Sequence, residues 1–148
     1  MQKAYKYSIL YFLVFSFLLI GSSIALFQVK IGFSIDAVLS YYQGNTTLFT
    51  PAKSSLGILK IILPHIFGFG LFIMVLLHFL VFTKLNNSKH LQILIYLAFT
   101  LAFLEIFTPF LIIQGILFFA YIKLFSFILL EFILLYLFYL LFITIVYE

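Results

Sequence analysis

Four long runs of apolar residues constrain this chain more than any other feature of its sequence. They cover about residues 7–27, 56–83, 91–110 and 118–145. Each run is long enough to cross the roughly 30 Å hydrocarbon core of a bilayer as an α-helix, which satisfies its own backbone hydrogen bonds. Charged residues make up only 8% of the 148 residues, whereas a soluble domain carries roughly 25%. The sequence therefore predicts an all-α, polytopic membrane protein whose single transmembrane domain, residues 1–148, is a four-helix bundle.

The first run also has features of a secretory signal peptide. Lys3 and Lys6 precede it, and Ser23-Ile24-Ala25 resembles a cleavage site with small residues. Its apolar stretch is longer than the core of a usual signal peptide. This length favours an uncleaved membrane helix.

Glycines and prolines mark places where these helices should pack closely or deviate from regularity. Gly21 in the first run and Gly68 and Gly70 in the second have no side chain, which predicts close approach of another helix. Pro64 removes one backbone hydrogen bond and predicts a kink in the second helix. Pro109 predicts that the third helix ends near residue 110 and is followed by an apolar connector.

The long polar connection between the first two runs, residues 30–55, contains signals for one short helix. Ser34 can cap a helix start, and Asp36 would lie in the first turn, where the helix dipole favours an anion. From Ile35 onward, apolar side chains recur at i, i+3, i+4 and i+7, which gives one apolar face. Gly44 suits the position just after a helix end. We therefore predict a short external amphipathic helix over residues 35–43, lying on the membrane surface or on the bundle.

The lysines outside the apolar runs indicate how the chain is oriented in the membrane. With the N-terminus in the cytoplasm, the inner side holds Lys3, Lys6, Lys84 and Lys89, and the outer side holds Lys30, Lys53 and Lys60. Four inner lysines against three outer ones follow the positive-inside rule by a small margin. We therefore predict that both termini are cytoplasmic and that residues 30–55 are external.

Composition and motifs also exclude several functions. The chain has no Cys, so it cannot form disulfides, thiolate metal sites or iron–sulfur clusters. The net charge of +4 is not gathered into a basic patch, so nucleic-acid binding is not predicted. The sequence has no HExxH, Walker or GxGxxG motif, and no Ser is placed with a His and a carboxylate for nucleophilic catalysis. An enzymatic activity is therefore not predicted.

Ionisable residues inside the apolar runs identify the first candidate site. A charge in a membrane helix costs at least about 2.5 kcal/mol, so it tends to face a partner or water. With a rise of about 1.5 Å per residue, Lys60, His65, Glu105 and Lys123 fall at one depth, in the outer leaflet. They could form a polar site for a quinone head group, a proton or a metal bound by His65. Alternatively, Glu105 pairs with Lys123 to hold two helices together, and Lys60 reaches to water.

A second candidate site lies deeper in the membrane. Glu131 falls near the middle of the fourth run, where it must be protonated, paired with a hydroxyl or a cation, or facing a cavity. His78 is a candidate partner from the second run. The two residues could form a proton or ion site, or Glu131 could make only a neutral hydrogen bond between helices.

Haem binding within one chain is disfavoured by the positions of the two histidines in the membrane. His65 and His78 lie on the same helix, 13 residues apart, which is about 20 Å along the axis and about 140° around it. They cannot bind opposite faces of one haem, and no other run supplies a His. A haem or a quinone would therefore occupy a site shared with another subunit.

One segment also resembles a known group of proteins. Tyr41-Tyr42-Gln43-Gly44, followed by Pro64-His65 and then His78, is similar to a group of small bacterial four-helix inner-membrane proteins, over about residues 32–82. The resemblance implies a bacterial inner (cell) membrane location and a role for His65, but no activity. In that group a second His often lies two residues after the first, and Phe67 occupies this position here.

Three functional hypotheses remain open at this point. The first is a non-catalytic subunit or accessory protein of a larger membrane complex, possible in respiration, with the lipid bilayer and other membrane subunits or further copies of the chain as partners. The second is a redox subunit that interacts with haem or quinone around His65, Glu105 and Lys123. The third is a small proton- or ion-coupled transporter that uses Glu131.

Overall fold

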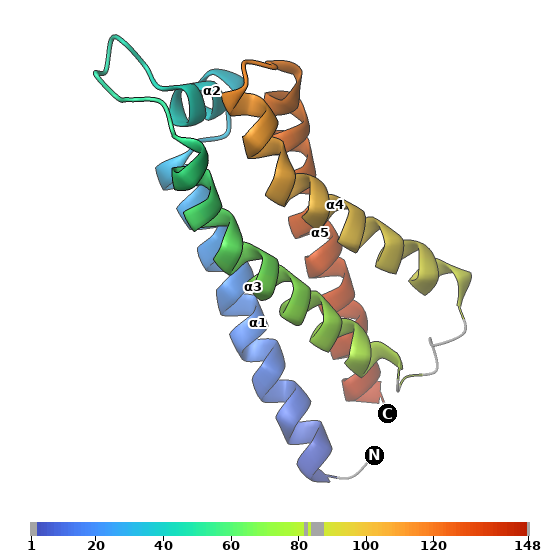
Figure 1. The fold of residues 1–148 in the computed structure, drawn as a ribbon. Helices are drawn as coiled ribbons and strands as arrows, with labels where there is room; N and C mark the ends of the chain where they lie inside the picture. The colour runs from blue at the N-terminus through green and yellow to red at the C-terminus, as the bar shows by residue number, and fades with distance from the viewer. Residues whose placement is uncertain (1–2, 82, 84–87, 148) are drawn as a thin grey trace.

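The computed structural model describes residues 3–81, 83 and 88–147, and its described part is helical apart from its connections (Figure 1). The helices are α1 (Lys3–Lys30), α2 (Ile35–Gln43), α3 (Ser55–Val81), α4 (Lys89–Ile113) and α5 (Phe118–Tyr147). α1, α3, α4 and α5 are long and apolar enough to cross a membrane. The predicted all-α fold with four membrane spans is confirmed. Phe82 and Lys84, which entered the prediction of the second span and of the orientation, lie outside the described residues.

The four long helices form an elongated bundle, and α2 lies across one of its ends (Figure 1). In the half away from α2, the core consists of aliphatic side chains from all four long helices; Leu76, Leu80, Leu137 and Leu141 are fully buried there. Many large apolar side chains on the outer faces are exposed, which is the pattern expected of a protein surrounded by lipid.

The short helix α2 has the predicted bounds and caps. The Ser34 side chain accepts a hydrogen bond from the Ala37 backbone N–H at 3.2 Å. Gly44 follows the helix with a φ of +81°, and a Cβ there would lie 2.6 Å from backbone atoms of the following loop, so a larger residue does not fit. Val38 and Tyr42 are buried because the apolar face of α2 packs on the ends of the long helices. The side of the membrane on which α2 lies stays a prediction.

The predicted end of the third span near residue 110 is wrong. α4 continues to Ile113 with Pro109 inside it. Proline has no N–H to donate to the carbonyl four residues earlier, which is the carbonyl of Glu105. The Lys123 ammonium group on α5 donates to this carbonyl at 2.8 Å. A side chain thus replaces the missing backbone donor, and the helix continues past the proline.

The close helix packing predicted at three glycines is also wrong within the described residues. A Cβ added to Gly21, Gly68 or Gly70 would meet no atom within 4 Å. These glycines therefore allow no close helix contact inside the described chain. Gly68 instead borders the cavity described next.

Candidate functional site

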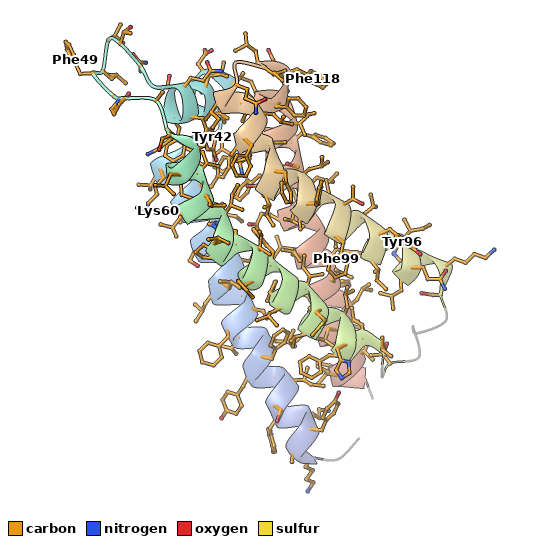
Figure 2. All side chains as sticks on the ribbon, in the orientation of Figure 1. Tyr42, Phe49, Lys60, Tyr96, Phe99 and Phe118 are labelled. Atoms are coloured by element: carbon orange, nitrogen blue, oxygen red, sulfur yellow. The ribbon has the colours of Figure 1, made fainter. Side chains whose placement is uncertain are left out.

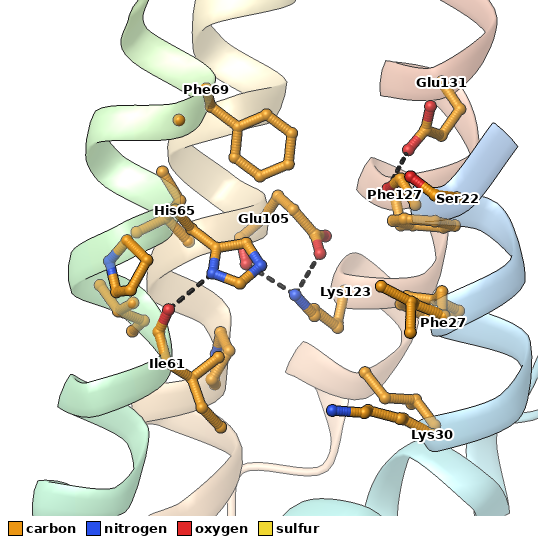
Figure 3. A pocket seen from close by; sticks show the side chains of 18 of the residues that line it. Ser22, Phe27, Lys30, Ile61, His65, Phe69, Glu105, Lys123, Phe127 and Glu131 are labelled. Carbon is orange, nitrogen blue, oxygen red and sulfur yellow. Dashed lines mark hydrogen bonds and ion pairs between the residues drawn. The ribbon is translucent and has the colours of Figure 1, made fainter. Parts of the chain in front are cut away.

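A cavity of about 530 Å³ lies between α1 and α3, in the half of the bundle next to α2 (Figure 3). α4 and α5 form its inner wall, and Tyr41 and Tyr42 of α2 border it at one end. Most of its lining is apolar, such as Phe69 and Phe127. Its volume and composition are those of a site for a small organic ligand.

The cavity is partly open between α1 and α3. Leu19 and Leu26 on α1 line it and are 51% and 56% exposed. Pro64 and Gly68 on α3 also line it and are exposed. Because both helices are membrane spans, this opening faces the lipid and not the aqueous phase.

Aromatic side chains close the space between the same two helices farther from α2. Phe12 packs against Phe72 and Phe79, with ring centroids 6.0 and 5.1 Å apart. Tyr5 meets Phe79 edge-on at 6.0 Å. The cavity is therefore confined to the half of the bundle next to α2.

A buried ion pair forms part of the inner wall. The Lys123 Nζ pairs with the Glu105 Oε1, and Ser126 donates to the Glu105 Oε2 at 3.3 Å. Both charged residues are at most 6% exposed. The pair joins α4 to α5, as the structural interpretation of these residues expects. Two of the three N–H groups of Lys123 donate within this network, so one can reach a ligand.

His65 presents one ring nitrogen to the cavity. Its Nδ1 lies 2.6 Å from the Ile61 carbonyl oxygen, one turn earlier in α3. A carbonyl oxygen only accepts hydrogen bonds, so Nδ1 carries the hydrogen and the Nε2 of the neutral ring is an acceptor. Figure 3 shows the ring directed into the cavity, beside Phe69. The same arrangement orients the histidines that bind metals, but the described residues contain no group of three His, Cys, Asp or Glu that could hold an ion.

Glu131 borders the cavity from α5 and joins this helix to α1. The Ser23 hydroxyl donates to its Oε1 at 2.6 Å. Its Oε2 is buried and has no hydrogen-bond partner in the described part of the chain. Ser23 therefore supplies the hydroxyl partner anticipated for Glu131. His78 does not line the cavity; it lies exposed on α3 with its ring 6.5 Å from that of Phe79.

The cavity thus collects most of the ionisable residues singled out from the sequence, and also residues that sequence reasoning missed. The predicted residues that line it are Lys60, His65, Glu105, Lys123 and Glu131. The missed ones are Ser22, Ser23, Lys30, Tyr41 and Tyr42. A prediction that combines the depth of Ser23 in the first span with that of Glu131 in the fourth would have suggested their contact.

α2 covers the end of the cavity and is fixed to the bundle by a specific contact. The Gln43 side chain donates to the Ile112 carbonyl at 2.8 Å. Burial raises the pKa of the Tyr42 phenol, and the negative charge of Glu105 raises it further. Tyr42 therefore borders the cavity as a neutral hydroxyl.

Comparison with known proteins supports the membrane assignment. A protein-family model described as a transmembrane helical domain matches residues 32–148, which is most of the chain. No curated protein and no solved structure matches the chain. The matched residues include α2 to α5 and thus all of the cavity except the wall that α1 contributes.

Proposed function

The chain belongs to the Aq_1264_TM family of transmembrane helical domains, and from this premise we propose that it is a non-catalytic membrane subunit that binds the head group of a quinone. The cavity between α1 and α3 is the proposed site. One observation carries the proposal: a lipid-facing apolar cavity contains buried polar atoms, at Lys123 and Glu131, whose hydrogen-bonding capacity is not fully used. In this proposal a partner subunit of a larger membrane complex carries any redox centre.

The shape and polarity of the cavity favour a quinone over other lipophilic ligands. A quinone ring is flat and neutral, and its two oxygens can reach polar groups between apolar walls. Its isoprenoid tail can leave through the opening between α1 and α3 into the lipid. A phospholipid phosphate would instead pair with the exposed amines of Lys30 and Lys60, and the buried groups would stay unused.

Filling the cavity is the direct test of this proposal. Gly68→Leu adds a side chain where a Cβ meets no atom within 4 Å, so the bulk enters the cavity without a clash at the backbone. We expect the variant to bind a short-chain ubiquinone or naphthoquinone at least tenfold more weakly than the wild type. Binding is measured on protein in nanodiscs, and empty nanodiscs correct for partition into lipid.

Gly21→Leu is the matched control. Gly21 also lies in an apolar span with no atom within 4 Å of an added Cβ, but it does not line the cavity. This variant should bind quinone like the wild type. Wild-type binding no stronger than that of empty nanodiscs, or equal binding by Gly68→Leu, would refute the proposal. A phospholipid retained by the wild type and lost from Gly68→Leu, without quinone binding, would reassign the cavity to lipid.

A further inference from the structure

The polar atoms that the cavity leaves unpaired are hydrogen-bond acceptors. The Nε2 of His65 is an acceptor because Nδ1 donates to the Ile61 carbonyl. The Oε2 of Glu131 is buried without a partner among the described residues, while Oε1 already accepts from Ser23. Buried acceptors are nearly always paired in native proteins. A ligand that fits this cavity should therefore bring donors to both atoms.

The hydroxyl donors nearest to these acceptors are already engaged. Ser23 donates to Glu131 at 2.6 Å, and Ser22 donates to the Leu19 carbonyl at 2.9 Å. Each of these hydroxyls has a single hydrogen to donate. Neither serine can therefore satisfy the free Glu131 oxygen as well.

Resting on the proposed function, we propose that the cavity selects the reduced form of the ligand, a hydroquinone that donates its two hydroxyl hydrogens to His65 and Glu131. Both redox forms of a quinone carry oxygens that accept hydrogen bonds, so donors such as Lys123 and Tyr42 serve either form equally. Only the hydroquinone has O–H groups. The acceptors alone therefore discriminate between the forms, and they would stay unpaired around an oxidised quinone.

The redox potential of the bound ligand measures this selectivity. If the hydroquinone binds at least tenfold more tightly than the quinone, the midpoint potential of the bound couple rises by about 30 mV or more relative to the free couple, since tenfold corresponds to about 30 mV for two electrons. The measurement is a redox titration of a short-chain ubiquinone with the wild-type protein in nanodiscs, and empty nanodiscs give the reference potential. The dissociation constants of the two forms, measured separately, should give the same ratio.

Glu131→Gln tests the residue assignment. The amide offers a donor as well as an acceptor, so it suits both forms, and the potential should fall back toward that of empty nanodiscs while the oxidised form still binds. Asp36→Asn makes the same change from carboxylate to amide on the exposed face of α2, outside the cavity. The control should keep the wild-type potential.

The outcomes separate this inference from the proposed function. Binding of both forms with equal affinity, and hence no shift of the wild-type potential, would overturn the preference for the hydroquinone and leave quinone binding intact. An unchanged potential in Glu131→Gln would overturn the role of Glu131. If neither form binds the wild-type protein above the level of empty nanodiscs, the proposed function itself fails.

Discussion

Replacing Lys123 by methionine should destabilise the bundle strongly, although methionine is apolar and of similar length. The substitution leaves the Glu105 carboxylate with Ser126 as its one remaining hydrogen-bond partner in the described chain. It also leaves the Glu105 carbonyl without a donor, because Pro109 cannot supply one. The side chains of the pair are only 7% and 8% exposed. Removing one member of such a buried pair costs about 3–5 kcal/mol, less whatever the carboxyl regains by taking up a proton.

The double variant Lys123→Met/Glu105→Leu decides whether the ion pair itself is responsible. It removes both charges, so it should recover most of the loss, because apolar replacement of a buried pair is often neutral or stabilising. Reversible unfolding in mixed detergent micelles, followed by far-ultraviolet circular dichroism, gives the free energies of unfolding. Lys60→Met, at an exposed cavity lysine, is the control and should change little. The reasoning is refuted if Lys123→Met costs less than about 1 kcal/mol, or if the double variant is as unstable as the sum of the single ones.

Three further predictions concern α2 and the loop that follows it. Gln43→Ala should cost about 1 kcal/mol and speed hydrogen exchange in α2, because it removes the bond to the Ile112 carbonyl; unchanged exchange would show that this contact does not hold α2. Phe49→Gly should change stability by less than about 1 kcal/mol, since Phe49 is 93% exposed at the loop tip with a φ of +52° (Figure 2); a larger loss in thermal unfolding would contradict this exposure. Burial raises the pKa of Tyr42 in the folded protein, so the wild type should lose stability as the pH rises above about 10, the unfolded value. Tyr42→Phe should lose less, and equal losses for both proteins would argue against a buried phenol.

The helices could be predicted from the sequence because each depends on local information. An apolar run of about 20 residues forms a membrane helix whatever its neighbours are, and the short helix carries its own caps at Ser34 and Gly44. The observed spans extend past the predicted bounds at several ends, as with α1 at Lys3–Lys30. Hydropathy loses precision there, because amphipathic and polar residues continue a helix beyond the hydrocarbon core.

The end of α4 could not be predicted, because it depends on a distant contact. Pro109 alone indicates a helix end. The continuation to Ile113 depends on Lys123, 14 residues later, which donates to the carbonyl that the proline leaves free. A helix-breaking signal was thus overridden by a partner on another helix.

The candidate site was predictable in depth but not in direction. Counting residues along the spans placed His65, Glu105 and Lys123 in one layer, and all three line the cavity. Counting does not tell which face of a helix meets which neighbour. For that reason the contact between Ser23 and Glu131, and the opening at Gly68, emerged only from the three-dimensional arrangement.

Photolabelling with a short-chain azidoquinone tests most directly whether the cavity binds a quinone head group. The label is applied to the protein in nanodiscs, and the modified residues are located by mass spectrometry. We predict that labelling falls on the cavity walls, within residues 19–31 of α1 and 58–72 of α3, that excess unmodified quinone prevents it, and that Gly68→Leu abolishes it. Labels spread over the exposed faces of the spans, insensitive to competitor and to Gly68→Leu, would contradict the account.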